Sequence, residues 1–211
     1  MKRHILFDFD GTIADSFPHI FAIACELLEI YPNEEELERL RNTPIKQLLK
    51  KYNIKLYQLP GMLLKGRAMF ESKIDELHVV YGFEQVLFDL KKKGYDLQIV
   101  SSNSNKNINK FLKNHPIKGL FSHINGNVGV FSKANALKKI MRKQGIDKAN
   151  CIYVGDELRD VEASHKIKLD VIAVSWGLNG KDLLYQAKPT ELVDDPKDFV
   201  STVERIFNNN N

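Results

Sequence analysis

The chain has 211 residues, of which 43% are hydrophobic, and a formal net charge of +4. A chain of this length and apolar content can bury one core, with or without an inserted segment, and is not typical of a disordered protein. No apolar run is long enough to span a bilayer, and Ile5-Leu6-Phe7 is too short to be the core of a signal peptide. We therefore expect a cytoplasmic protein without a membrane partner.

The charged residues and the two cysteines narrow the choice of partners and cofactors. The lysines are dispersed, and this mild positive balance suits an anionic substrate. No interleaving of basic and aromatic residues indicates nucleic acid as a partner. Cys25 and Cys151 lie in apolar surroundings without the spacing of metal ligands, so we interpret both as reduced residues of the core.

The N-terminal segment combines an apolar run with two carboxylates. Ile5-Leu6-Phe7 predicts a short buried strand, Asp8-Phe9-Asp10 follows it directly, and Gly11 allows a sharp turn. Two carboxylates that converge at a strand end are costly unless a cation or a shared proton offsets their charge. Taken alone, the same residues are as typical of an ordinary acidic turn.

Residues 16–81 are predicted to be helical, with no convincing strand. Ile20, Ile23, Ala24, Leu27 and Leu28 form one apolar face at helical spacing, and Asp15 and Ser16 are candidate N-cap residues for this first helix. The further predicted helices span 34–41, 45–52 and 58–77.

From residue 82 onward, helical patterns alternate with short apolar runs. This alternation predicts an α/β protein with a parallel sheet that is covered on both faces, so residues 16–81 are an insertion after the first strand. The predicted helices span 83–93, 133–144, 161–166 and 196–207, and the predicted strands span 95–100, 151–154 and 171–174, with an edge strand at 192–193.

Polar residues follow two more of the predicted strands. Ser101 and Ser102 follow one strand and precede a helix, where hydroxyl and backbone N–H groups can bind an anion or simply cap the helix. Asp156 and Asp160 lie four residues apart at another strand end. Lys133 is the first residue of the predicted helix 133–144, which precedes that strand. This number of carboxylates favours a hard divalent ion, with Mg²⁺ the usual choice beside phosphate oxygens.

These motifs together resemble the haloacid dehalogenase superfamily of phosphohydrolases, in particular its branch that is similar to phosphoglycolate phosphatase and β-phosphoglucomutase. The motifs are Asp8-Phe9-Asp10-Gly11-Thr12 with Asp15-Ser16, then Ser101, Lys133, and Gly155-Asp156 with Asp160. The segment Val174-Ser175-Trp176-Gly177-Leu178, followed by Lys188-Pro189, is also similar to that branch. The resemblance implies a three-layer Rossmann-like core, made of residues 1–15 and 82–211, with residues 16–81 as an inserted α-helical cap.

The resemblance also implies a role for each motif residue. Asp8 attacks phosphorus and forms an aspartyl-phosphate, and Asp10 protonates the leaving alcohol and later deprotonates water. Mg²⁺ is held by Asp8, the backbone carbonyl of Asp10 and Asp156, while Asp160 binds through water or orients Lys133. The phosphoryl group is held by the following residues: Lys133, Ser101, Ser102, Gly11 and Thr12. The implied activity is Mg²⁺-dependent hydrolysis of a small phosphorylated metabolite.

Two departures from the branch and several alternatives remain open. Ala134 follows Lys133 where the branch often has proline, and Asn42-Thr43-Pro44-Ile45 replaces the glycine and substrate-gripping arginine of related sugar phosphomutases. The second departure disfavours a phosphomutase, which remains the nearest alternative. Asp10 also disfavours dehalogenation and a phosphate-accepting switch without turnover, because neither needs this acid and base. Phosphonate hydrolysis needs a distinguished lysine in the cap, and none stands out.

The sequence does not identify the substrate or the oligomeric state. Arg41, Lys46 and Arg67 are candidate anion contacts in the cap, but a solvated helix surface explains each of them at least as well. Phe17 fits the core and the substrate site equally. Both a monomer and a homodimer are compatible with the sequence.

Overall fold

The computed structural model describes residues 2–129 and 132–209 as an α/β fold with a six-stranded sheet. Every strand pair is parallel, and the strand order is β3-β2-β1-β4-β5-β6. The strands are β1 (His4–Phe7), β2 (Asp96–Val100), β3 (Phe121–Asn125), β4 (Cys151–Gly155), β5 (Asp170–Val174) and β6 (Glu191–Val193).

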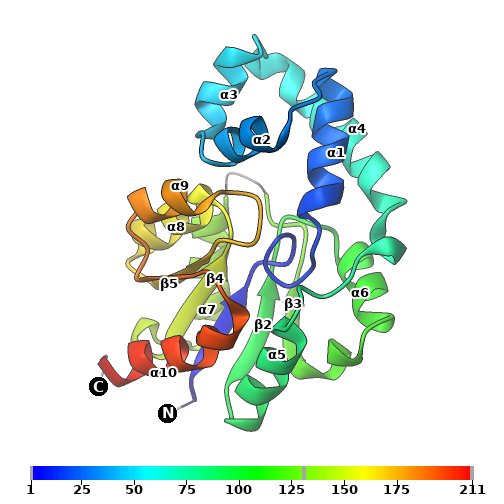
Figure 1. Cartoon of the computed structure of the whole chain (residues 1–211). Coiled ribbons are helices and arrows are strands. Elements are labelled where there is room, and N and C mark those ends of the chain that lie inside the picture. Colours follow the sequence, from blue (N-terminus) through cyan, green and yellow to red (C-terminus); the bar gives the residue numbers. More distant parts are fainter. Residues whose placement is uncertain (1, 130–131, 210–211) are drawn as a thin grey trace.

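The helices fall into two groups (Figure 1). Four of them lie together above the sheet: α1 (Phe17–Leu28), α2 (Glu34–Arg41), α3 (Ile45–Lys51) and α4 (Leu59–Glu71). The other six flank the sheet: α5 (Phe83–Lys92), α6 (Asn105–Lys113), α7 (Lys133–Gln144), α8 (Leu158–Ile167), α9 (Lys181–Gln186) and α10 (Phe199–Asn209). None of the helices in the described residues has the length and apolar character needed to cross a membrane.

The strands divide the core into two halves because successive side chains point to opposite faces of a sheet. Ile5 and Phe7 of β1 belong to a cluster with side chains of α5, α6 and α10, whereas Leu6 belongs to a second cluster with side chains of α7, α8 and α9. The sheet is therefore covered on both faces, as the near-continuous apolar runs of its strands predict.

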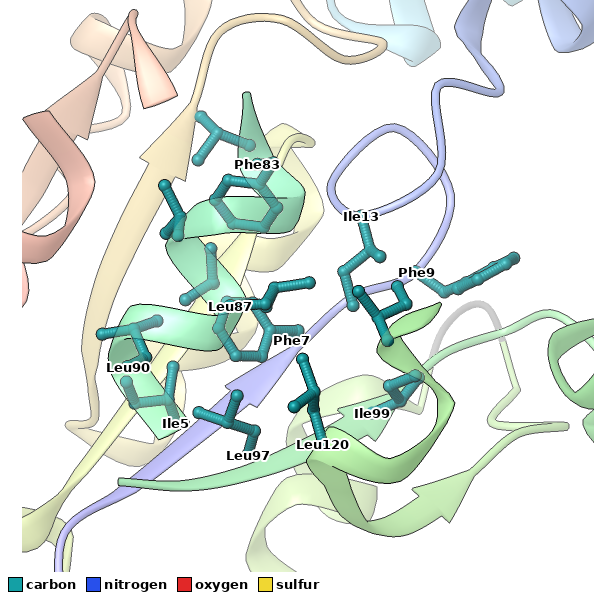
Figure 2. Packing of buried hydrophobic residues seen from close by; sticks show 14 of the residues in the cluster. Ile5, Phe7, Phe9, Ile13, Phe83, Leu87, Leu90, Leu97, Ile99 and Leu120 are labelled. Carbon is teal, nitrogen blue, oxygen red and sulfur yellow. The ribbon is translucent and has the colours of Figure 1, made fainter. Parts of the chain in front are cut away.

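Phe7 anchors the end of β1 immediately before Asp8. Its ring is fully buried and lies 6.0 Å from that of Phe83 and 6.1 Å from that of Phe199, centroid to centroid. Figure 2 shows Ile5 and Phe7 directed toward the side of the sheet that carries Phe83 of α5. Because this packing leaves the strand end little freedom, the position of the Asp8 backbone is fixed by the core.

One strand and one short helix that flanks the sheet were not predicted. Strand β3 lies at the edge of the sheet, where its side chains are partly or fully exposed, so its sequence lacks the continuous apolar run of the central strands. Helix α9 has only six residues, too few for a helical pattern to be recognised. By contrast, α2 and α7 begin and end at the predicted residues.

Candidate active site

Three neighbouring strands, β2, β1 and β4, bring polar residues to one edge of the sheet. Asp8 follows β1, Ser101 follows β2, and Asp156 follows β4. All three side chains are buried. In parallel sheets the loops beyond the carboxyl ends of the strands form the ligand site, so these residues lie where the fold places its chemistry.

Lys133, the first residue of α7, joins two carboxylates. Its Nζ atom lies 2.5 Å from Asp8 Oδ2 and 2.5 Å from Asp160 Oδ1, and the lysine side chain is only 3% exposed. Burial alone would lower the pKa of Lys133, but the charges of Asp160 and Asp8 raise it well above its usual value. The lysine therefore remains a cation, and it fixes the orientation of both carboxylates.

Asp156 is enclosed by two loops that allow it no alternative position. The Thr12 hydroxyl donates to Asp156 Oδ1 at 2.9 Å, and the Leu178 backbone N–H donates to Oδ2 at 2.7 Å. A side chain at Gly11 or at Gly177 would overlap the Asp156 carboxylate, and Gly11 also has a φ of +70°. Glycine is thus required at both positions for the backbone to approach Asp156.

Asp8, Asp156 and Asp160 form a group whose oxygen atoms are suited to a divalent cation. Each offers one carboxylate oxygen, and these atoms lie within 4.8 Å of one another. Lys133 supplies one positive charge against these three buried carboxylates, so negative charge remains in excess. Burial, followed by the charge of Glu157, raises the pKa of Asp156 well above its ordinary value. A hard cation bound by carboxylate oxygens would offset this charge, and the residues therefore fit such an ion.

The carboxylate of Asp10 faces Asn103 rather than the other three. Asn103 Nδ2 lies 3.0 Å from Asp10 Oδ2 and 3.2 Å from Oδ1. Burial and then the charge of Asp8 raise the pKa of Asp10 to about 7, against the lowering effect of the Asn103 hydrogen bond. A carboxyl group with this pKa can release and accept a proton near neutral pH.

Ser101 and Ser102 lie at the start of the loop that leads to α6. The Ser101 hydroxyl is buried and accepts a hydrogen bond from the Asn103 backbone N–H at 3.2 Å. Its backbone N–H and C=O groups bind Asn125 and Val128, so the main chain is fixed while the hydroxyl keeps its proton for another acceptor. Ser102 is half-buried beside it.

Gly11 and Thr12 form the turn that follows Asp10. The Gly11 N–H donates to Ser16 Oγ at 2.9 Å, and the Thr12 N–H points to the Phe9 carbonyl oxygen at 3.4 Å. These N–H groups contribute to the turn after Asp10. The Thr12 hydroxyl also binds Asp156, and Gly11 leaves room for the Asp156 carboxylate. The contacts of Gly11 and Thr12 with a phosphoryl group stay a prediction.

The haloacid dehalogenase-like hydrolase family matches this chain over residues 5–174, which is most of its length. The chain belongs to this family. It is 31% identical over 207 residues to the phosphoglycolate phosphatase of Synechococcus elongatus, covering 96% of this chain and 98% of that protein. It is 26% identical over 204 residues to the pyrophosphatase PpaX of Bacillus velezensis, covering 93% and 94% respectively.

Solved structures show the same fold. A haloacid dehalogenase-like hydrolase from Streptococcus pneumoniae aligns with a TM-score of 0.76 at 19% identity, covering 96% of this chain and 98% of that one. The predicted resemblance, the α/β Rossmann-like fold and the prediction of a hydrolase of the phosphatase class are therefore confirmed.

In this haloacid dehalogenase-like hydrolase, Arg41 connects the helical group α1–α4 to the loops of the sheet. Arg41 Nη2 donates to the carbonyl oxygens of Ser175 and Gly177, each at 2.8 Å, and its guanidinium lies 4.9 Å from the centre of the Phe17 ring. The interpretation of Arg41 as a solvated charge was wrong, because its side chain is only 18% exposed and faces carbonyl oxygens that the sequence does not reveal. The prediction that Arg41 contacts an anion of the substrate stays a prediction. Lys46 and Arg67 are exposed.

We expect Arg41→Met to weaken the contact between α2 and the loop at Ser175 to Gly177. A hydrogen bond to a charged group contributes roughly 1.5–3 kcal/mol, so the free energy of unfolding should fall by about that amount. Urea unfolding measures the change. Arg39→Met is the matched control, since the Arg39 side chain is 69% exposed on the same helix. An equal loss in both variants would contradict a specific contribution from Arg41.

Proposed function

We propose that this protein is a Mg²⁺-dependent phosphomonoesterase that acts on a small phosphorylated metabolite similar to phosphoglycolate. The carrying observation is that two aspartates only two positions apart in the sequence have different surroundings. Asp8 is held by Lys133, whereas Asp10, two residues later, has a pKa of about 7 and faces away toward Asn103. Two carboxyl groups with different environments can serve as nucleophile and as acid and base.

Asp8 is the proposed nucleophile. One carboxylate oxygen forms a bond to phosphorus while the bond from phosphorus to the ester oxygen breaks, which gives an aspartyl-phosphate and an alcohol. The Phe9 N–H donates to Asp8 Oδ1 at 2.7 Å, and Lys133 holds Oδ2, so the carboxylate cannot rotate away from the line of attack. Lys133 and the Ser101 hydroxyl are the proposed contacts of the phosphoryl oxygens, with Ser102 beside them.

Asp10 is the proposed general acid and base. Its proton passes to the leaving oxygen as the ester bond breaks, and the resulting carboxylate then takes a proton from the water that attacks the aspartyl-phosphate. Hydrolysis releases inorganic phosphate and restores the carboxylate of Asp8. A pKa near 7 suits both directions of transfer.

Mg²⁺ is the proposed ion, held by Asp8, Asp156 and the backbone carbonyl of Asp10, with Asp160 oriented by Lys133 close enough to contribute. When bound, this ion neutralises charge on the transferring phosphoryl group and positions it. The three carboxylates themselves are kept in place by Lys133, Thr12 and the Leu178 N–H.

We further propose that residues 16–81 act as a cap over the core formed by residues 1–15 and 82–211. Support comes from the position of α1–α4 above the sheet in Figure 1 and from the contact of Arg41 with Ser175 and Gly177. A cap that closes over the loops excludes water during phosphoryl transfer. We propose a cytoplasmic location for the enzyme.

Phosphate release from a panel of substrates tests the proposed activity. The panel contains phosphoglycolate, inorganic pyrophosphate, a sugar phosphate and p-nitrophenyl phosphate, each with Mg²⁺ or with a chelator. We expect stoichiometric, metal-dependent phosphate release from phosphoglycolate and weaker release from the sugar phosphate. A phosphomutase would convert the sugar phosphate without releasing phosphate. A switch without turnover would be labelled stably by acetyl phosphate, and either result would overturn the proposal.

We expect Mg²⁺ to stabilise the protein more strongly at pH 7.5 than at pH 5. The folded-state pKa values of Asp156 and Asp10 are raised, so the folded chain keeps protons that the unfolded chain has released, and stability falls as pH rises from about 4 toward 7. Mg²⁺ binds the ionised carboxylates and reverses this loss. At about 100 times Kd, binding adds about 2.7 kcal/mol, which raises the Tm of a chain of this size by roughly 5–10 °C.

Thermal unfolding with Mg²⁺ or with chelator at the two pH values measures this effect. Asp156→Asn should abolish the Mg²⁺ shift, whereas Asp15→Asn, which alters an exposed carboxylate of the neighbouring loop, should retain it. A shift of equal size at both pH values would show that the ion binds elsewhere.

A further inference from the structure

Asn103 connects the carboxyl group of Asp10 to the beginning of α6. Its Nδ2 atom contacts both carboxylate oxygens, at 3.0 Å and 3.2 Å. The side chain is half-buried, and no motif assigns it a role. The Ser16 side chain is a second hydrogen-bond partner of this carboxylate and, like Asn103, acts to lower its pKa.

The orientation of the Asn103 amide is fixed by an unambiguous donor. Asn103 Oδ1 accepts a hydrogen bond from the Ser104 backbone N–H at 2.7 Å and another from Asn107 Nδ2 at 3.0 Å. A backbone N–H can only donate, so the amide oxygen must face Ser104 and the NH₂ group must face Asp10. The two hydrogen bonds accepted by Asn103 Oδ1 therefore establish that the NH₂ group, and not the amide oxygen, faces the Asp10 carboxyl group.

The support for Asn103 is itself rigid. Ser104 is the N-cap of α6, and its hydroxyl accepts from the Asn107 N–H at 3.1 Å. Asn107 is buried in the first turn of the same helix. Hydrogen bonds to the backbone of Ser104 and to the side chain of Asn107 thus attach the Asn103 amide to the start of α6 and restrict its rotation.

We propose that Asn103 is a positioning residue that holds the Asp10 carboxyl in the orientation needed for proton transfer to the leaving oxygen. This inference rests on the proposed phosphatase function. The terminal torsion of an aspartate has a broad energy minimum, so a carboxyl without a partner samples many orientations. Because Asn103 Nδ2 lies within hydrogen-bonding distance of both carboxyl oxygens, it fixes the plane of the carboxyl group and so the direction of its O–H group.

The proposed role has a chemical signature in the choice of leaving group. Proton transfer from Asp10 assists the departure of an alkoxide, because an alkoxide is a poor leaving group. It gives little assistance to p-nitrophenolate, which is stable as an anion. A residue that only orients the acid must therefore affect alkyl phosphates more than p-nitrophenyl phosphate in the step that forms the aspartyl-phosphate.

Single-turnover kinetics of the full chain with Mg²⁺ test this signature in Asn103→Ala. We expect glycolate release from phosphoglycolate to slow on the order of tenfold to a hundredfold, since general acid catalysis contributes about 10²–10⁴-fold and only its orientation is lost. The release of p-nitrophenolate in a single turnover should keep its wild-type rate, and the steady-state KM for phosphoglycolate should not change.

Two further variants separate orientation from structure. Asn107→Ala leaves Asn103 in place but removes one of its two anchors, so it should give a smaller loss with the same preference for alkyl phosphate. Asn109→Ala is the matched control, because Asn109 lies exposed on the same helix and its side chain donates to the Asn105 carbonyl oxygen. It should behave as wild type with both substrates.

The results divide cleanly. Equal slowing of both substrates in Asn103→Ala, or no slowing of either, would overturn the positioning role while leaving the proposed function intact. If the wild-type protein released neither glycolate nor p-nitrophenolate, the proposed function would fail, and the role of Asn103 would fail with it.

Discussion

Asp8→Asn should lower phosphate release by a factor on the order of 10⁴ or more. An amide is a poor nucleophile toward phosphorus, and it is also a poor ligand for Mg²⁺, so both proposed roles of Asp8 are lost together. The measurement is kcat/KM with phosphoglycolate at saturating Mg²⁺. The fold should persist, because Lys133 retains its ion pair with Asp160.

The control for this variant is Asp15→Asn, which changes an exposed aspartate in the same loop. It should keep wild-type kcat/KM, and both variants should show cooperative unfolding. Substantial turnover by well-folded Asp8→Asn would exclude an aspartyl-phosphate on this residue and would direct attention to water as the direct nucleophile.

Asp10→Asn should accept a phosphoryl group and then stall. Asparagine cannot deprotonate water, so hydrolysis of the aspartyl-phosphate loses general base catalysis, a factor of about 10²–10⁴. Acetyl phosphate is a suitable donor because its leaving group needs no protonation. Intact-mass spectrometry should show one added phosphoryl group, and hydroxylamine should remove it.

The added phosphoryl group should be absent from Asp8→Asn and from the double variant that carries both Asp8→Asn and Asp10→Asn. The pH dependence of the wild type gives a second measure, because the pKa of Asp10 is raised to about 7. The acid must be protonated in the first step, so kcat/KM should fall as pH rises above about 7. A variant that hydrolyses phosphoglycolate at the wild-type rate would refute the assignment of acid and base to Asp10.

The central elements of the fold could be predicted because their sequences have one dominant signal. Strands β1, β2, β4 and β5 are buried on both faces, which gives continuous apolar runs, and polar residues follow them directly. Strand β3 carries no such run because it lies at the sheet edge, where its side chains are partly or fully exposed to solvent. Its place at the edge cannot be read from its residues. Edge strands in general carry less sequence signal for this reason.

The motif residues could be predicted as a group, but their individual contacts could not. Ser101, Lys133 and Asp156 were candidates because they adjoin strand ends and helix starts, and the structure brings each of them to one edge of the sheet. Asn103 was not among the candidates, since its contact with Asp10 joins positions 93 residues apart. The burial of Arg41 could not be predicted for a similar reason, because two of its partners are the distant backbone oxygens of Ser175 and Gly177, and any residue supplies a backbone oxygen.

The loop from Ser175 to Leu178 contacts both the helical group α1–α4, through Arg41, and the site at the sheet edge, through Asp156. Arg41 holds its carbonyl oxygens from above, and the Leu178 N–H holds the Asp156 carboxylate from below. Two events that share one structural element are thermodynamically linked, and such linkage is reciprocal. An ion bound by Asp156 should therefore stabilise the contact between α2 and this loop. A substrate that stabilises the same contact should in turn slow the exchange of that ion with solvent.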